Sequence, residues 1–532
     1  MYWPFELLTL PGFKRSVFVI VLLLLGAANV ARAQKTVELK QAELLRAGRT
    51  PSGEQFQKLI ADVVLVQNET TIYCDSAFLF KQRNYVEAFG NVRITEGDSV
   101  TITGRRLEYD GNTKIAKLRQ NVVFTKLETA TLYTEYLDFN RVKNMAYYYN
   151  GGRLVDSINV LTSKKGYYNS TTNMASFKRD VVVTNPDYTM TSDSLQYNSR
   201  TKMIYFRTPT KVVNRDSSTF LYNSGEYNTI TKQSDLRGGY GESEEYTLKS
   251  DDYKLDERLK VYKLRGNVVM TSKKESLIIY GQSADYFRSQ GISKVYNNAY
   301  VAKITDDNDT LFMSADTLVS IESDDPSKKR LLAYHKVKIF KRDMQGLADS
   351  VEYRSADSIL HFYKNPILWS EGNQMTADSI SMLIKNNTID RIFLKVNSFV
   401  ISRDTLLNFN QIKGRRMVAQ FRDSNIRKVD VNGNGESLYF ALEEPSANKD
   451  SVSKAMGLNK IICSDITIRF VDGKVNNLSF YKRPDAHFIP PHEMKEEDKR
   501  LPGFSWRDKD KPRKRDVVKT PKNAPLVDRK RL

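Results

Sequence analysis

Apolar and polar residues alternate with a period of two along most of this chain. In the segment 91–118, for example, the runs 91–95, 100–103 and 115–118 alternate, and turns rich in Asp, Gly and Asn separate them. Successive side chains of a β-strand point to opposite faces, so the pattern predicts short strands with one apolar and one polar face. Only residues 37–45 show a helical spacing, and we expect a short helix there.

Two short phrases recur about every 30 residues, which is the spacing of a repeat protein. The first is a small residue followed by Asp: after Asp285, three further copies follow at intervals of 31, 33 and 29 residues. The second is Asn-Val or Asp-Val followed by apolar residues, with copies at Val92 and, 30 residues later, Val122. We expect two or three strands per period and about fourteen stacked units between residues 63 and 481.

Stacked units of this kind place their apolar faces side by side and line a continuous apolar interior. The residues expected to line it are Val92, Ile94, Leu107, Val122, Phe124, Leu137, Val181, Val183, Leu195, Val268, Met270, Val337, Ile339, Ile367 and Trp369.

The N-terminus has the three parts of a cleavable export signal. Lys14 and Arg15 precede the apolar run 17–28, and Ala31-Arg32-Ala33 forms a small-residue cleavage site before Gln34. The apolar run is short against the ~20 residues of a membrane-spanning helix. We therefore expect residues 1–33 to be a signal peptide that is removed.

Breaks in the repeat divide the rest of the chain. We expect a linker at 34–55, a first β-region at 56–240 and a second at 241–485, with the glycine cluster 238–241 as the boundary. The last stretch, 486–532, is rich in Lys, Arg and Pro, and we expect it to be a disordered basic tail.

The charge balance favours anionic partners. The formal net charge is +19, and it becomes +17 without the signal peptide, which holds three basic residues and one acidic residue. Nucleic acid, acidic polysaccharide and membrane-lipid phosphates all fit this charge, but export argues against nucleic acid.

The sequence offers no catalytic or metal-binding motif. Its four histidines lack metal-ligand spacing, and the repeated Asp is expected to accept hydrogen bonds from turn amides. Cys74 and Cys463 are 389 positions apart, so we expect free thiols. We therefore expect no enzyme, no cofactor and no metal.

The best-kept phrases resemble a known family. Gly-Asn-Val occurs at 90–92 and 266–268, and the run Leu-Arg-Gly-Asn-Val-Val-Met at 264–270 is followed by Tyr-Gly-Gln-Ser-Ala-Asp-Tyr at 280–286. These phrases, which recur over most of residues 56–481, resemble the organic-solvent-tolerance (OstA)/LptA-like family of lipopolysaccharide transport proteins.

The resemblance implies an all-β fold: a repetitive, antiparallel, open β-jellyroll, in which a sheet is folded over an apolar groove. It also implies a periplasmic protein, with association with the outer membrane as a further option. The groove residues above would shield the lipid A part of lipopolysaccharide, with Arg93, Lys273 and Lys274 near the lipid phosphates. The chain would join end to end with itself, or with jellyroll domains of inner- and outer-membrane transport components.

Two other classes stay open at this point. An extracellular right-handed β-helix that binds or acts on acidic polysaccharide would need parallel strands and a carboxylate cluster. An outer-membrane barrel would need strands of ~10 residues with an outward apolar band.

Overall fold

The computed structural model describes residues 36–519, except 98–99, 127–129, 157, 275, 306–308, 386–387, 423–424, 444–453 and 472–473. The expected signal peptide and residues 520–532 lie outside the described residues. The chain forms two compact units, Met1–Lys178 and Arg179–Leu532, and β13 (Met174–Thr184) contains the boundary.

The first unit consists of β-strands in its described part. They are β1 (Glu38–Gln41), β2 (Leu44–Arg49), β3 (Gln55–Gln67), β4 (Thr70–Phe80), β5 (Tyr85–Glu96), β6 (Val100–Asp110), β7 (Ile115–Lys126), β8 (Ala130–Asn140), β9 (Met145–Tyr148), β10 (Gly152–Asp156), β11 (Asn159–Ser163) and β12 (Lys165–Asn169).

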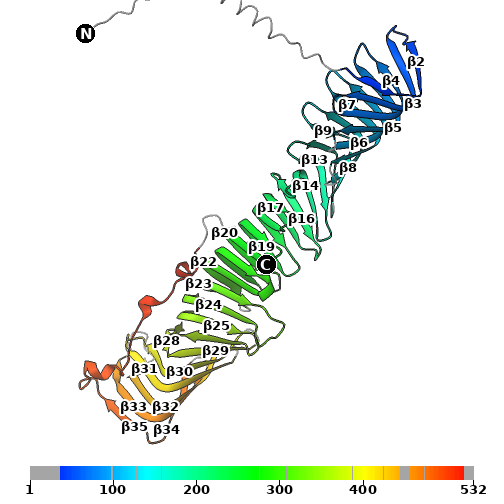
Figure 1. Cartoon of the computed structure of the whole chain (residues 1–532). Coiled ribbons are helices and arrows are strands. Elements are labelled where there is room, and N and C mark those ends of the chain that lie inside the picture. The colour runs from blue at the N-terminus through cyan, green and yellow to red at the C-terminus, as the bar shows by residue number, and fades with distance from the viewer. Residues whose placement is uncertain are drawn as a thin grey trace, which may run out of the picture. The chain divides into compact units, whose positions relative to one another are not determined.

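The second unit continues the pattern, as the stacked strands of Figure 1 show. Its strands are β14 (Tyr188–Asn198), β15 (Met203–Phe206), β16 (Thr210–Asn214), β17 (Thr219–Asn228), β18 (Gln233–Glu242), β19 (Tyr246–Asp256), β20 (Val261–Ser272), β21 (Leu277–Phe287), β22 (Ile292–Ile304), β23 (Thr310–Ile321), β24 (Arg330–Phe340), β25 (Met344–Arg354), β26 (Ile359–Tyr363), β27 (Ile367–Ser370), β28 (Asn373–Thr376), β29 (Ser379–Lys385), β30 (Thr388–Arg403), β31 (Phe409–Arg422), β32 (Asn425–Leu442), β33 (Ala455–Val471), β34 (Lys474–Tyr481) and β35 (Asp485–Ile489). Its short helices are η1 (Arg288–Gln290), η2 (Glu496–Lys499), η3 (Asp508–Asp510) and α2 (Lys514–Val517).

The repeat of about 30 residues is a pair of long strands, each bent near its middle. In β5 the bend is a β-bulge, where the register with β6 shifts between Phe89 and Val92. The two residues at this bulge, Gly90 and Asn91, have φ angles of 71° and 39°. Gly and Asn adopt this left-handed conformation more readily than other residues, which explains the recurrent Gly-Asn-Val phrase.

The bulges fold each sheet over on itself and create two walls. In β25, residues 344–347 pair with β27, whereas residues 350–354 pair with β26. Buried side chains from both parts, such as Met344 and Val351, belong to one apolar cluster. The strands therefore enclose an apolar layer between two walls, as in a β-jellyroll.

From β20 onward, we define the two walls by these halves of the strands. One wall, called here the strapped wall, comprises residues 268–272, 277–281, 299–304, 310–314, 337–340, 344–348, 367–370, 373–376, 398–403, 409–413, 435–442, 455–463 and 485–489. The other, called the free wall, comprises residues 261–265, 283–287, 292–296, 317–321, 330–334, 350–354, 359–363, 379–385, 388–395, 416–422, 425–432, 465–471 and 474–481.

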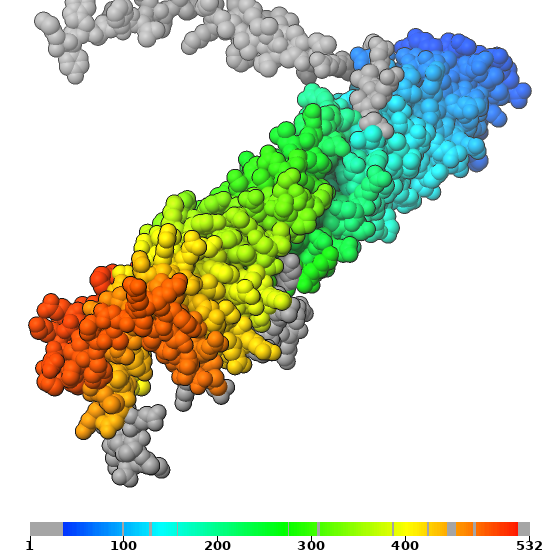
Figure 2. Space-filling model, turned by 90° about the horizontal axis from the view of Figure 1, so that it is seen from below, coloured from blue at the N-terminus to red at the C-terminus, as the bar shows by residue number. Residues whose placement is uncertain are grey.

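The chain after β35 is ordered up to residue 519, which corrects the expectation of a disordered tail for this part. Residues 490–518, called here the strap, lie along the second unit from β33–β35 back toward β23 (Figure 1). In Figure 2, orange and red residues of the last strands and the strap lie against the yellow strands. Leu501 and Val517 of the strap are 2% and 0% exposed. Burial of these apolar side chains holds the strap against the sheet although the segment is rich in basic residues.

Three further expectations differ from the structure. Residues 37–45 hold β1 and the start of β2 instead of a helix. Both strands lie in the expected linker, but they pair with β3 and so belong to the sheet. The expected boundary at 240–241 lies inside β18. There, a Cβ on Gly239 would approach Tyr222 at 2.8 Å and Tyr253 at 3.0 Å, so this glycine makes room for aromatic rings.

Candidate functional site

The apolar interior of the first unit is built from cross-strand rows. One row joins Ile94, Ile102 and Phe124 across β5, β6 and β7, because residues directly opposite each other share a face. Another joins Leu107 on β6 to Leu137 on β8 through β7. All predicted interior residues of this unit are at most 2% exposed; they are Val92, Ile94, Leu107, Val122, Phe124 and Leu137.

Most of the predicted interior residues of the second unit are also buried. Those with exposed fractions of 2% or less include Val337 and Ile339, which pack with Phe362 and Leu368 in one cluster. Met270 is half-buried. The others buried to this extent are Val181, Val183, Leu195 and Val268.

Ile367 and Trp369 are buried on the opposite face from the one predicted. Their neighbour Leu368 belongs to the interior cluster, and alternate residues of a strand face opposite ways. Trp369 pairs with Gln374, whose amide bonds the strap, and Ile367 lines a shallow hollow with Arg507 of the strap. The run Ile-Leu-Trp is apolar on both faces, so its sequence pattern did not assign a face.

The interior is filled by the protein's own side chains in this structure. Core residues of both walls, such as Leu368 and Phe362 at 0% exposure, belong to one hydrophobic cluster. Burial of each such side chain stabilises the fold by ~1.5–3 kcal/mol. A ligand of the interior therefore has to separate the two walls and replace these contacts.

The repeated Asp supports the bulges. Asn91 Nδ2 donates to Asp75 Oδ2 at 2.9 Å, and Asn267 Nδ2 donates to Asp251 Oδ2 at 2.6 Å. A Cβ on Gly90 would lie 2.2 Å from the same Asp75 oxygen, so only glycine fits beside the carboxylate. The predicted structural role holds, but the partner is a bulge of the next long strand instead of a turn.

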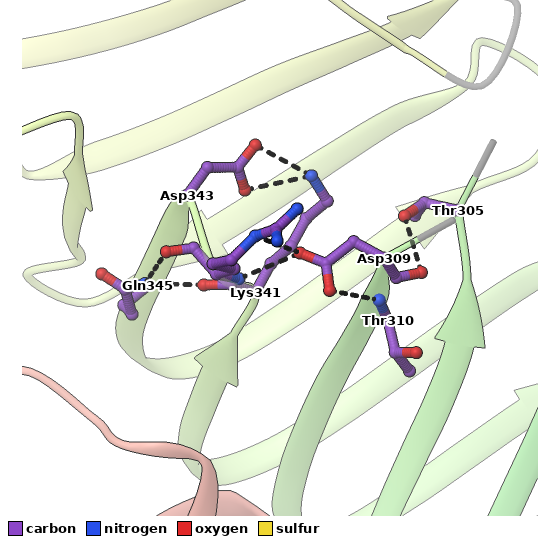
Figure 3. A network of polar contacts seen from close by, with 7 residues as sticks. Thr305, Asp309, Thr310, Lys341, Asp343 and Gln345 are labelled. Carbon is purple, nitrogen blue, oxygen red and sulfur yellow. Dashed lines mark hydrogen bonds and ion pairs between the residues drawn. The ribbon is translucent and has the colours of Figure 1, made fainter. Parts of the chain in front are cut away.

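Other carboxylates also serve structure, as Figure 3 shows for the hairpin ends of β22–β25. Lys341 Nζ donates to both oxygens of Asp343, at 3.0 and 2.9 Å, and the buried Gln345 amide donates to the Lys341 carbonyl at 2.6 Å. Within the described ranges, no three His, Cys, Asp or Glu side chains are arranged to hold a metal ion.

Both cysteines are free and buried. Burial raises the pKa of Cys74 from 9.0 to about 12 and also raises that of Cys463. Burial likewise lowers the pKa of His361, the most enclosed of the four histidines, so its neutral form is favoured. Reactive thiols are ionised and accessible, whereas these are neither.

The charges expected at the groove rim are used within the protein. Lys273 pairs with Glu242 at 2.6 Å and Lys274 with Glu245 at 2.7 Å. The Arg93 guanidinium lies 4.3 Å from the Tyr73 ring centroid. These contacts stabilise the outer surface and leave the interior as the candidate functional site.

The residues that sequence reasoning missed lie outside this interior. Gln374 and Gln411 are 1% and 0% exposed, and both bond the strap backbone. A signal was present: apolar runs at 367–369 and 399–401 interrupt the alternation and indicate strands covered on both faces.

The fold and interior together define an antiparallel β-jellyroll of repeated hairpins with a continuous apolar layer in each unit. Two family models match the chain: "OstA-like protein" over residues 34–193, and "LptA/(LptD N-terminal domain) LPS transport protein" over residues 247–388. Over these two segments the chain is therefore similar to OstA/LptA-like domains of lipopolysaccharide transport proteins.

The other comparisons add less. No curated protein matches the chain. Among solved structures, LptH, the LptA homologous periplasmic component of the conserved lipopolysaccharide transport device from Pseudomonas aeruginosa, matches with 15% identity over 22% of this chain and 79% of that chain. Its TM-score is 0.19, and the likeness therefore carries no argument.

Proposed function

We propose that this chain carries lipopolysaccharide across the periplasm and shields its acyl chains between the two walls of each unit. The observation that carries the proposal is the continuous apolar layer of each unit, where side chains such as Phe124, Val337 and Ile339 are at most 2% exposed. The matches to the two family models support the choice of ligand.

The energetics fit a carrier. Removing a dozen methylenes from water is favourable by on the order of 10 kcal/mol. Part of this gain is lost, because the acyl chain replaces side-chain contacts that the closed protein already makes. A ligand bound in this way is kept from water without being trapped at one position, so it can pass along the repeats when energy is supplied elsewhere.

The partners and location follow from the same proposal. The chain is exported, works in the periplasm, and contacts jellyroll domains of membrane components or a second copy through its terminal strands. Strand addition to unpaired edges provides the physical basis for such contacts. Among the residues that the structure describes, no helix is long and apolar enough to cross a membrane.

The alternative of a β-helix loses its support. Strand pairs along both units, such as β5 with β6 and β30 with β31, are antiparallel, whereas a β-helix needs parallel coils. The carboxylates of the repeat also serve the bulges instead of forming a cluster.

Site-specific photo-crosslinking in intact cells tests the proposal. A crosslinker at Phe124 or Ile339 faces the interior, and one at Val123 or Lys338, the preceding residue on the same strand, faces outward. We expect lipopolysaccharide adducts from the two interior positions only. Equal labelling of both sets, or labelling of neither set, would reject the shielding role.

A further inference from the structure

Two buried glutamines hold the strap by the same pattern of hydrogen bonds. Gln411 donates to the Lys499 carbonyl and accepts from the Leu501 amide, both at 2.8 Å. Gln374 donates to the Ser505 carbonyl at 2.6 Å and accepts from the Arg507 amide at 2.7 Å. Each side-chain amide thus pairs with the strap backbone as a neighbouring strand would.

Apolar contacts anchor the strap over its whole length. Near its start, Leu501 packs into a cluster with Ile401 and Leu438, and the Trp506 ring lies 5.2 Å from that of Phe409. At its end, α2 contacts β23 and β24, and Val518 packs against a cluster of Ile278, Tyr280 and Tyr300. The strap therefore spans the strands from β20 to β33.

Every one of these contacts is made to the outer face of the same wall. Gln374 and Gln411 lie in one cross-strand row with Ile401, and this row faces away from the interior cluster. Phe312, over which Lys514 lies at 4.6 Å, is on the same side. The strapped wall is thus packed on both faces, with the interior on one side and the strap on the other.

The free wall has no such second layer among the described residues. Its outer face exposes aromatic side chains, including Tyr334 at 39% and Tyr363 at 37%, which lie in one cross-strand row. The free wall meets the strapped wall at bulges such as His335–Lys336, with φ angles of 62° and 55°. Movement of this wall breaks the packing of one face only, so it costs less than movement of the strapped wall.

We infer that the strap holds one wall of the second unit fixed, and that the unit opens for its lipid by movement of the free wall about the bulges. The inference rests on the proposed function, because it describes how the filled interior admits an acyl chain. The strap would then restrain the strapped wall, which is a role that its basic composition does not indicate.

Hydrogen exchange of the full-length protein without lipid gives the first test. The four short strands form a matched set: β27 and β28 belong to the strapped wall, and β26 and β29 to the free wall. We expect slower exchange in β27 and β28 than in β26 and β29. The double variant Gln374→Leu, Gln411→Leu should abolish this difference and speed exchange at the Leu501 and Arg507 amides about tenfold or more.

Gln420→Leu is the matched control, because Gln420 lies on β31 as Gln411 does, but in the free wall. We expect it to leave the strap amides unchanged. Equal exchange in the two walls of the unaltered protein, or strap amides that do not respond to the double variant, would overturn the inference.

Addition of lipopolysaccharide gives the second test. We expect faster exchange in β26 and β29, with β27, β28 and the strap unchanged. If lipid binds and the strap is released, or if lipid binds and exchange speeds up equally in both walls, the inference is wrong but the proposed function stands. If no lipid binds, the proposed function fails, and the difference between the walls in the lipid-free protein still decides the role of the strap.

Discussion

At the scale of single residues, a few side chains determine where each strand bends. The pair Asp75 and Gly90 shows the principle: the carboxylate lies where a Cβ would be, and it accepts a hydrogen bond from Asn91. Asp251, Gly266 and Asn267 repeat this arrangement in the second unit. The recurrent Gly-Asn-Val phrase of the sequence therefore marks the bulge at which the sheet folds over.

Gly90→Ala tests this arrangement. Steric overlap with Asp75 and the positive φ of 71° should together destabilise the first unit by roughly 1–3 kcal/mol. The measurement is the midpoint of urea unfolding, with hydrogen exchange in β4–β6 as the probe of unfolding. Gly97→Ala is the control, since φ is 51° there but nothing lies within 4 Å of the added Cβ. Adding Asp75→Ala should recover part of the loss, and a purely additive double variant would contradict the steric explanation.

Cys74 provides a prediction about pH. Its thiol has a pKa of about 12 in the folded protein against an ordinary value of 9.0, because burial disfavours the thiolate. Because the pKa of the thiol is higher in the folded protein than in the unfolded chain, ionisation of the thiol favours unfolding. The contribution of Cys74 to the free energy of unfolding is therefore complete below pH 9 and is lost as the pH rises toward 12.

In a Cys463→Ala protein at pH 8, we expect iodoacetamide to alkylate Cys74 about a hundredfold more slowly than in denaturant. Mass spectrometry of the labelled protein over a pH series measures this rate. Rapid labelling of the folded protein at pH 8 would show that the thiol is accessible, against the structure.

At the scale of elements, the second unit contains strands of two kinds. Strands of the free wall have one face toward the apolar interior and one toward solvent, as alternation predicts. Strands such as β27 have two dry faces, since Leu368 faces the interior and Trp369 faces the strap side. The strap is what allows these strands to carry apolar residues on both faces in water.

Leu501→Ala tests how firmly the strap is docked. The side chain is 2% exposed within an apolar cluster, so its truncation should cost about 2–4 kcal/mol of docking energy. We expect trypsin to cleave after the exposed Lys509 at least about tenfold faster than in the unaltered protein. Glu497→Ala, an exposed change in η2, should leave the rate unaltered. Equal rates in both variants would mean that Leu501 does not anchor the strap.

At the scale of the whole molecule, the chain forms two compact units, and a segment of each matches a model of OstA-like or lipopolysaccharide transport proteins. A periplasmic carrier of lipid must first leave the cytoplasm, and we expect residues 1–33 to direct this step as a signal peptide. The repeats then provide the apolar layer, and no catalytic centre is required for the proposed function.

Ala33→Arg tests export and processing together. Small residues are needed just before the cleavage site, so the charged side chain should block cleavage. We expect the unaltered chain to be recovered from the periplasm beginning at Gln34, and the variant to keep its first 33 residues. Intact-mass measurement of both proteins after cell fractionation shows the outcome. A mature chain that still begins at Met1 would refute the signal-peptide assignment.

The sequence by itself determined the local features of this protein. Alternation indicated the strands of the repeat, although not β1 and β2, and the spacing of about 30 residues indicated that similar units stack. Interior residues such as Ile94, Phe124 and Ile339 were predicted because a strand with a single apolar face leaves one choice of orientation. The family phrases, which coincide with the bulges, then indicated a jellyroll.

Only the tertiary structure decided the rest. The alternation of apolar and polar residues cannot assign Ile367 and Trp369 to one face of the strand, because residues 367–369 are all apolar. Composition alone made the strap look disordered, since its stability depends on contacts between residues far apart, such as Gln374 and Arg507, which are 133 positions apart. Local pattern reports the propensity of a segment, whereas burial of the strap depends on a surface that exists only after the sheet has folded.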